Sequence, residues 1–171
     1  MKQAIKTKVI ILTGPGGSGK TTVAEMLEQK LGFVRLDADR ADTEFFPHGG
    51  QWLPENIENL RKAHDKILQL TQAMVAEGKK VVVDYIIFGD YSHFFKKFKE
   101  VFGDDIEVII LFPSIEETIK RDAERECWTT GHERIRVVRG EFEALKTEIG
   151  AEHFVDTSAQ TPEATFRMLF E

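Results

Sequence analysis

The chain has 171 residues, 42% of them hydrophobic and 30% charged, which is typical of a globular protein and fits one α/β domain over residues 1–171. The formal net charge of −6 at pH 7 argues against a general nucleic-acid binder, because such a protein carries a basic stripe. No apolar run approaches the ~20 residues that cross a membrane, and the one cysteine cannot form an internal disulfide, so we expect no membrane partner and a cytoplasmic location.

The first predicted elements are a buried strand and a helix, with a glycine-rich loop between them. The strand covers Val9 to Thr13, because this run is almost continuously apolar. The helix covers Gly19 to Leu31, where apolar residues recur at helical spacing. The loop between them follows the Walker A pattern of phosphate-binding loops, a glycine, four residues and then Gly-Lys-Thr: Gly14-Pro15-Gly16-Gly17-Ser18-Gly19-Lys20-Thr21.

Each residue type in this loop has a mechanical role in binding a triphosphate. Glycines let successive backbone N–H groups turn toward one anion, and the start of the following helix adds the positive end of its dipole. Lys20 is expected to reach the β- and γ-phosphates and to act in catalysis, and the Thr21 hydroxyl is expected to bind Mg²⁺. The alternative is a glycine-rich turn without a ligand. The predicted nucleotide-binding residues of the loop are Gly14, Gly16, Gly17, Ser18, Gly19, Lys20, Thr21 and Thr22.

Four more apolar runs alternate with helical patterns along the rest of the chain. The predicted strands lie at residues 33–36, 79–84, 106–112 and 153–156. Pro54 can open the helix after the irregular segment 45–52, and Ser114 to Glu117 has the spacing of a capping box. The alternation predicts a parallel sheet covered by helices on both faces, with ligands bound outside the carboxyl ends of the strands.

Two carboxylates, Asp37 and Asp39, follow the second predicted strand. Their spacing of two residues on an extended segment points both side chains to the same side. Asp37 could hold Mg²⁺ through water while Asp39 accepts a proton from a substrate hydroxyl, which is the pair of roles that phosphoryl transfer needs. The alternative is that Asp37 only caps a short helix that begins at Ala38.

Asp84 ends the third predicted strand, after a run of apolar residues that resembles a Walker B strand. Its functional interpretation is a ligand of the Mg²⁺ water shell or a substrate contact. The alternative is a strand-end carboxylate that accepts hydrogen bonds from nearby backbone N–H groups. The functional interpretation is favoured, because burying an idle charge beside the phosphate loop would be unfavourable.

Arginines on both sides of a Thr-Thr-Gly sequence suggest a mobile lid over residues 121–136. Arg121 and Arg125 are one helical turn apart and share a face. A closing lid could bring Arg125 or Arg134 to the transferring phosphoryl group and exclude water, and Arg136 is a weaker candidate for this role. The alternative is a solvated helix face on which these arginines pair with glutamates.

The remaining candidates carry weaker signals. The side chains of Trp52 and Tyr85 could stack on a substrate ring or simply pack. Cys127 is expected to be an inert thiol, although it lies beside Arg125. Four histidines lack metal-ligand spacing and are expected to be surface or core residues: His48, His64, His132 and His153.

Together these patterns resemble the small P-loop kinases, a group that includes gluconate kinase, shikimate kinase, adenylylsulfate kinase and chloramphenicol phosphotransferase. The resemblance implies a three-layer P-loop NTPase fold with a five-stranded parallel sheet of order 2-3-1-4-5 and a helical lid. It also implies ATP and Mg²⁺ as cofactors, Arg121 beside the adenine or the phosphates, and Thr157 in a loop that borders the adenine. The stretches that carry it are residues 14–21, Leu36-Asp37-Ala38-Asp39, the arginine helix and Val155-Asp156-Thr157-Ser158.

The segment after the third strand departs from these families. Gluconate kinases carry a Cys-Ser-Ala-Leu-Lys type stretch there and shikimate kinases a glycine-rich turn, whereas this chain has Asp84-Tyr85-Ile86-Ile87-Phe88. Because this position helps to choose the substrate, the resemblance implies no particular acceptor. The chain therefore looks like a separate branch of the group.

The sequence leads to the prediction of an ATP-dependent phosphotransferase that moves the γ-phosphate to a hydroxyl group of a small metabolite or antibiotic. One alternative is a nucleotide-binding NTPase or switch module without an acceptor. Another is a 5′-hydroxyl polynucleotide kinase, which the negative net charge disfavours. A monomer and a homodimer are both compatible with the sequence.

Overall fold

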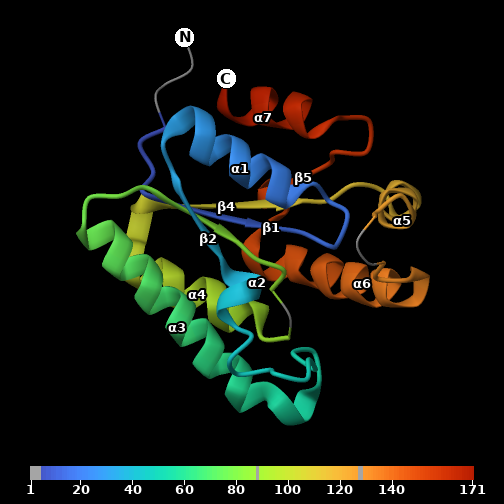
Figure 1. Ribbon diagram of the computed structural model, residues 1–171, viewed down its shortest axis with the longest axis horizontal. Helices are drawn as coiled ribbons and strands as arrows, with labels where there is room; N and C mark the ends of the chain where they lie inside the picture. The colour runs from blue at the N-terminus through green and yellow to red at the C-terminus, as the bar shows by residue number, and fades with distance from the viewer. Residues whose placement is uncertain (1–4, 88, 127–128) are drawn as a thin grey trace.

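The computed structural model describes residues 5–87, 89–126 and 129–171. Within these ranges the centre of the molecule is a parallel sheet with the strand order β2-β3-β1-β4-β5 (Figure 1). This sheet confirms the predicted strands, their parallel direction and the order 2-3-1-4-5. The strands are β1 (Val9–Thr13), β2 (Val34–Asp37), β3 (Val81–Asp84), β4 (Ile106–Leu111) and β5 (Phe154–Val155).

Helices connect the strands and cover both faces of the sheet. The α-helices are α1 (Lys20–Leu31), α2 (Ala38–Ala41), α3 (Ile57–Ala76), α4 (Tyr91–Phe102), α5 (Ile115–Ala123), α6 (His132–Ile149) and α7 (Pro162–Phe170). Short 3₁₀ turns are η1 (Pro54–Asn56), η2 (Gly103–Asp105) and η3 (Ala151–His153). Figure 1 shows α1 and α7 on one face of the sheet and α3, α4 and α6 on the other, which confirms the three-layer architecture.

The bounds of the predicted strands differ from the structure by one or two residues at several ends, and two boundaries differ for local reasons. Pro54 opens the 3₁₀ turn η1, and the α-helix begins only at Ile57. The fifth strand has two residues instead of the predicted four, because His153 belongs to η3 and the chain turns at Asp156. At that turn the Ser158 N–H donates a hydrogen bond of 2.9 Å to Asp156 Oδ1, which is the local side-chain bonding that ends strands.

The core lies on both sides of β1, whose residues are all buried. Ile10 and Leu12 pack with residues of α1 and α7, whereas Val9 and Ile11 pack with residues of α3, α4 and α6. A strand covered on both faces has no polar side to alternate with, which explains its continuous apolar run. The buried strand holds the loop at its carboxyl end in a fixed position.

His64 lies inside the layer formed by α3 and α4, with only 1% of its surface exposed. Its ring centroid is 4.9 Å from that of Phe94 and 5.8 Å from that of Tyr85. Neither ring nitrogen has a hydrogen-bond partner among the residues that the structure describes. Burial therefore lowers the pKa of His64 to about 4, and the expectation of a core histidine is confirmed at this position.

This histidine is expected to make the protein acid-sensitive. In the unfolded chain His64 is protonated below its ordinary pKa of 6.5, whereas in the folded chain it is protonated only below about pH 4. Stability from neutral His64 is thus complete above pH 6.5 and is lost as the pH falls toward 4, by about 3 kcal/mol. Denaturant unfolding at pH 7 and pH 4.5 should show a smaller acid loss in His64→Phe than in the parent. The exposed His48→Gln variant is the control, and equal acid losses in the parent and His64→Phe would contradict the prediction.

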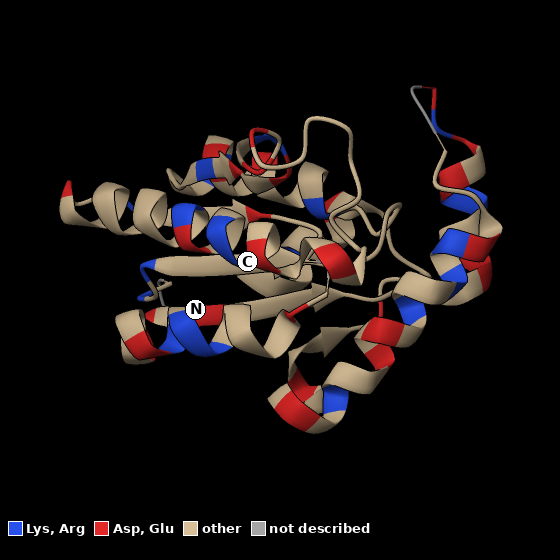
Figure 2. Cartoon of the chain, turned by 90° about the horizontal axis from the view of Figure 1, so that it is seen from below, with Lys and Arg blue, Asp and Glu red and all other residues tan. Residues whose placement is uncertain are grey.

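The surface carries both signs of charge. Basic and acidic residues are interspersed along the helices in Figure 2, and this view shows no stripe of basic residues. Over the three described ranges, no helix combines the length and the apolar character that crossing a membrane requires.

Candidate active site

The Walker A loop joins β1 to α1 at the carboxyl edge of the sheet (Figure 1). A Cβ atom added to Gly14 would lie 2.3 Å from the carbonyl oxygen of Leu111, so β4 leaves room only for glycine. Gly19 precedes α1 with a φ of 89°, a conformation that other residues rarely adopt. The Ser18 N–H closes the turn by donating a hydrogen bond of 3.1 Å to the Pro15 carbonyl. The loop therefore needs its glycines for backbone shape.

A cavity of about 200 Å³, called the phosphate cavity below, opens at the start of α1. Burial lowers the pKa of Lys20, which is 5% exposed, and the nearby charges of Asp39, Asp84 and Asp37 act in the opposite direction. The first N–H groups of a helix have no partner within the helix and suit an anion. The lining and the glycine geometry fit a nucleoside triphosphate. The residues that line the phosphate cavity are Gly17, Gly19, Lys20, Thr21, Thr22 and Arg125.

Asp39 lies in α2 with its side chain turned to the end of β3. Its Oδ1 accepts a hydrogen bond of 3.1 Å from the backbone N–H of Ile86. Burial raises the pKa of Asp39 to about 7, against the lowering effects of the Lys20 charge and the Ile86 N–H. A carboxylate with a pKa near the working pH is suited to accept a proton. The structure thus brings the predicted base near the lysine of the loop.

Asp37 and Asp84 lie side by side, because β2 and β3 pair with these two residues in register. Asp37 Oδ1 accepts a hydrogen bond of 3.1 Å from the Arg40 N–H and caps α2. The capping alternative is therefore confirmed for this oxygen. The second oxygen, Oδ2, lies 3.8 Å from Arg35 Nη2.

Asp84 is 2% exposed, and its main partner, Arg35, was not predicted from the sequence. Asp84 Oδ2 accepts hydrogen bonds of 3.0 Å and 2.8 Å from Nε and Nη2 of Arg35. This oxygen therefore binds an arginine side chain and not the backbone N–H groups of the predicted alternative. Arg35 stands two residues before Asp37 on β2, so strand alternation places both side chains on the same side. That spacing is the signal that could have identified Arg35.

The oxygen atoms of this region fit Mg²⁺. Asp84 Oδ1 is buried and has no hydrogen-bond partner among the described residues, and an unsatisfied buried acceptor is unfavourable unless a ligand completes it. Thr21, Asp37 and Asp84 would supply only oxygen donors, which Mg²⁺ prefers. The described residues contain no group of three or more His, Cys, Asp or Glu that could hold a metal ion without a phosphate. Mg²⁺ typically takes its other ligands from phosphates and water.

The predicted lid comprises the end of α5, the segment after it and the first turns of α6. A Cβ atom on Gly16 would lie 2.9 Å from Thr130 Oγ1 and 3.7 Å from Arg125 Nη1, so the lid packs on the phosphate loop. The lid is held there by Asp122, a buried residue that was not predicted from the sequence. Cys127, expected to be inert, lies outside the described residues, as does Phe88.

Asp122 binds the lid through its carboxylate. Its oxygens accept hydrogen bonds from the backbone N–H of Thr130 (2.8 Å) and of Gly131 (3.1 Å). Arg125 Nη1 lies 3.8 Å from Asp122 Oδ1. Burial acts to raise the pKa of Asp122, but these hydrogen bonds outweigh it and hold the pKa below its ordinary value. Asp122 therefore ties the backbone at Thr130 and Gly131 to helix α5, close to Arg125.

Replacing Asp122 with asparagine should loosen the lid. The amide offers one acceptor oxygen where the carboxylate offers two, so one N–H of the lid loses its partner at a cost of about 1–2 kcal/mol. We expect turnover to fall about tenfold and limited proteolysis to cut the lid segment faster. Glu124→Gln, an exposed change on the same segment, is the control. Unchanged turnover and unchanged cleavage in Asp122→Asn would show that Asp122 does not position the lid.

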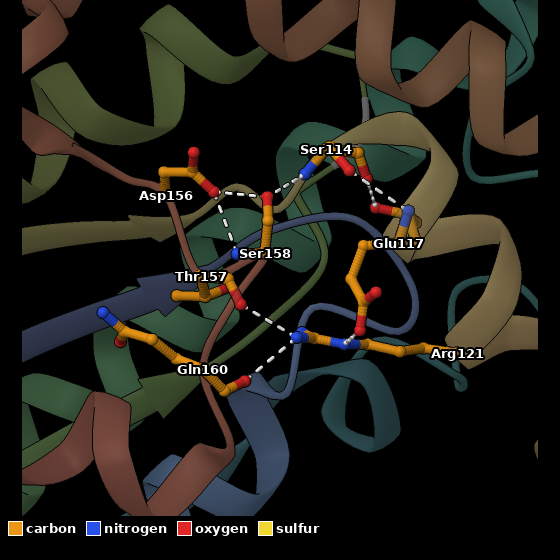
Figure 3. Close-up of polar contacts among 8 residues, drawn as sticks. Ser114, Glu117, Arg121, Asp156, Thr157, Ser158 and Gln160 are labelled. Atoms are coloured by element: carbon orange, nitrogen blue, oxygen red, sulfur yellow. Dashed lines mark hydrogen bonds and ion pairs between the residues drawn. The ribbon is translucent and has the colours of Figure 1, made fainter.

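Arg121 joins α5 to the loop after β5 (Figure 3). Its Nη2 donates hydrogen bonds to the carbonyl oxygens of Thr157 (2.8 Å) and Gln160 (3.0 Å), and its Nε donates to Glu117 (2.8 Å). Arg121 thus holds the loop that the resemblance places beside the adenine. Direct contact of Arg121 or Thr157 with a nucleotide stays a prediction.

The capping-box spacing at Ser114 is only half realised. Ser114 Oγ accepts a hydrogen bond of 3.2 Å from the Glu117 N–H, as predicted. The Glu117 carboxylate does not return to the Ser114 N–H, because it binds Arg121 instead (Figure 3). The Ser114 N–H donates to Ser158 Oγ at 2.7 Å. Both helix α5 and the loop after β5 are fixed by this exchange of partners.

A second cavity of about 380 Å³ is lined in part by Pro15 and Gly16 of the phosphate loop, and it is called the acceptor cavity below after the role proposed for it. Trp52, which is 44% exposed, and Arg134 face each other there, with the guanidinium carbon 4.6 Å from the ring centroid. Arg125 thus lines the phosphate cavity and Arg134 the acceptor cavity, while Arg136 is exposed. The acceptor cavity is lined by Pro15, Gly16, Trp52, Ile86, Thr129, Thr130, Arg134, Ile135 and Val138.

Tyr85 packs instead of facing a ligand. It is fully buried, and its hydroxyl donates a hydrogen bond of 3.0 Å to Asp42 Oδ2. Of the two alternatives for this side chain, packing is therefore confirmed. A larger cavity of about 440 Å³ lies between α4, β4 and α6, where it is lined by Lys99, Ile106 and other residues but by none of the predicted site residues.

Comparison with known proteins places the chain in a family. Residues 9–149 match the family model described as AAA domain. Three solved structures have the same fold. A sugar kinase from Janibacter sp. has a TM-score of 0.69 and 18% identity, and the match covers 95% of this chain and 91% of that chain. A gluconokinase from Sinorhizobium meliloti (TM-score 0.64, 17% identity, coverage 98% and 91%) and a shikimate kinase from Acinetobacter baumannii in complex with shikimate (TM-score 0.64, 20% identity, coverage 95% and 90%) match in the same way. No curated protein sequence matches the chain. The chain belongs to the AAA domain family and has the fold of the small P-loop kinases.

Proposed function

We propose that the protein is an ATP-dependent phosphotransferase that moves the γ-phosphate of ATP to a hydroxyl group of a small molecule. The position of Asp39 carries this proposal. Its carboxylate is held by the N–H of Ile86, a residue that lines the acceptor cavity, and it feels the charge of Lys20 in the phosphate cavity. A base between a phosphate site and a second cavity is the arrangement that transfer to a hydroxyl requires.

Each charged residue then has a defined task. Lys20 and the loop N–H groups bind the phosphates, and Arg125 stabilises the charge of the transferring group when the lid is closed. Asp39 orients the acceptor hydroxyl and takes its proton while the acceptor oxygen bonds to the γ-phosphorus and the bond to the ADP oxygen breaks. Mg²⁺, when bound near Thr21, Asp37 and Asp84, supplies further positive charge beside the phosphates.

The acceptor cavity distinguishes this proposal from a nucleotide switch. A switch module has no need of a second cavity beside its base, nor of a covering segment that carries Trp52. A polynucleotide kinase would need a basic surface for its substrate, whereas the chain has a net charge of −6 and mixed charges along its helices (Figure 2). A small-molecule acceptor therefore has more support.

An ADP-release screen tests the proposal. The protein with Mg²⁺ and saturating ATP is offered sugar acids, nucleosides, antibiotics and oligonucleotides, and products are identified by mass spectrometry. We expect at least one small hydroxyl compound to raise ADP release well above the basal rate and to gain one phosphate. If no compound does so, the protein is an NTPase or switch, and if only oligonucleotides do so, it is a polynucleotide kinase.

A further inference from the structure

The walls of the acceptor cavity are mainly apolar, and besides Pro15 and Gly16 of the phosphate loop they come from three separate parts of the chain. Trp52 comes from the irregular segment 45–52, Ile86 follows β3, and Ile135 and Val138 belong to α6. Ile135 and Val138 are 1% and 4% exposed, so the core fixes their positions. A cavity of about 380 Å³ is large enough for a drug-sized ligand.

The polar side chains of the cavity are few and lie on the lid. They are Thr129, Thr130 and Arg134, and the described lining contains no Asp, Glu, Asn, Gln or His. A polyol or sugar acid buries many hydroxyl groups, each of which needs a hydrogen-bond partner to replace water. Most of its hydroxyl groups would face carbon atoms here. The lining therefore disfavours a polyol and favours a ligand of low polarity.

Trp52 offers such a ligand an aromatic ring that is already oriented. The guanidinium of Arg134 packs against the indole, which restricts its rotation. Asp42, three residues before the segment 45–52, is buried and accepts a hydrogen bond of 3.0 Å from the Tyr85 hydroxyl. A preorganised ring loses little freedom when a ligand stacks on it.

Resting on the proposed function, we infer that the acceptor is an alcohol carried on a flat aromatic ring system, bound among Trp52, Ile86 and the apolar wall of α6. The ring fills the apolar part of the cavity, and its hydroxyl group reaches Asp39 at the Ile86 end. The same lining disfavours open-chain polyols and sugar acids. Trp52 is thus a specificity-determining residue for the acceptor.

The test compares aromatic alcohols with gluconate and shikimate in two measurements. The first is ADP release with Mg²⁺ and ATP, and the second is binding without ATP, followed by Trp52 fluorescence in a Trp128→Phe variant. Calorimetric titration of the unmodified chain repeats the binding comparison without a substitution. We expect the best aromatic alcohol to have a kcat/KM at least tenfold above those of gluconate and shikimate and to change Trp52 fluorescence.

Substitution of the ring adds a matched comparison. Trp52→Ala should raise KM for the aromatic alcohol about tenfold, the usual effect of losing one stacking partner. Leu53→Ala is the control, because Leu53 is the next residue and has a similar exposure of 39% against 44% for Trp52. Its KM should stay within about twofold of the parent. An equal effect of both changes on KM would overturn the role of Trp52.

The outcomes separate this inference from the proposed function. If sugar acids raise ADP release and aromatic alcohols do not, the acceptor class is wrong and phosphoryl transfer stands. If aromatic alcohols bind and change Trp52 fluorescence but no hydroxyl compound raises ADP release, the ligand class stands and the proposed function fails. If aromatic alcohols neither bind nor raise ADP release, the inference is overturned.

Discussion

Replacing Asp39 with asparagine is expected to lower kcat by about 10²–10³ while the affinity for ATP changes little. Asparagine has the same shape and keeps an oxygen for the Ile86 N–H, so the local structure should persist. It cannot take the proton of the acceptor hydroxyl. Steady-state turnover with an acceptor and titration of ATP binding give the two quantities.

The pH profile of this variant adds a second readout. Burial raises the pKa of Asp39 to about 7, and only the deprotonated carboxylate can accept a proton. In the parent, kcat/KM should therefore rise with pH up to about 7 and level off above it, and Asp39→Asn should lose this rise. Asp104→Asn, on an exposed side chain, is the control for the chemical change itself. A variant with parental turnover and the parental profile would show that Asp39 is not the base.

Replacing Lys20 with methionine is expected to lower kcat by about 10²–10³ and to weaken ATP binding as well. Lys20 lines the phosphate cavity, where its ammonium group would supply positive charge to the β- and γ-phosphates. The methionine side chain is uncharged and cannot supply it. Its loss also removes one positive charge that acts on Asp39, Asp84 and Asp37, of which Asp84 and Asp37 keep Arg35. Steady-state turnover with an acceptor and titration of ATP binding give these two quantities for Lys20→Met.

The fold should survive this change, which separates lost chemistry from lost structure. Burial of the Lys20 ammonium is unfavourable, as its lowered pKa indicates, so removing it should not lower the melting temperature appreciably. Lys30→Met is the matched control, because Lys30 lies on the same helix with its side chain 46% exposed. Parental turnover in Lys20→Met, or an equal loss in Lys30→Met, would contradict the role of Lys20.

Much of the fold could be predicted because its signals are local. The apolar run of β1, the glycines of the loop and the helical spacing of α1 are each contained within a few residues. The strand order came from the resemblance to P-loop kinases, and the parallel pairing of the strands confirms it. The fifth strand was predicted too long, because a side-chain hydrogen bond at Asp156 turns the chain early.

The site was predicted less completely, because its missing parts depend on contacts between distant segments. Arg35 and Asp84 are 49 residues apart and meet only through the register of β2 and β3. Asp122 binds the lid through backbone N–H groups, which leave no pattern in the sequence. Asp42 likewise accepts a hydrogen bond from Tyr85, a residue 43 positions later in the chain. The loop residues could be named from the sequence, whereas the acceptor cavity required the folded chain.

Transfer of the γ-phosphate to an acceptor hydroxyl can be followed with a label on that phosphate. The protein is incubated with Mg²⁺, γ-³²P-labelled ATP and the hydroxyl compounds of the screen, and the labelled products are separated. We expect label in a phosphate ester of one small hydroxyl compound, with one ADP formed per ester, and no ester with Asp39→Asn on the same timescale. Label that appears only as inorganic phosphate with every compound would contradict it.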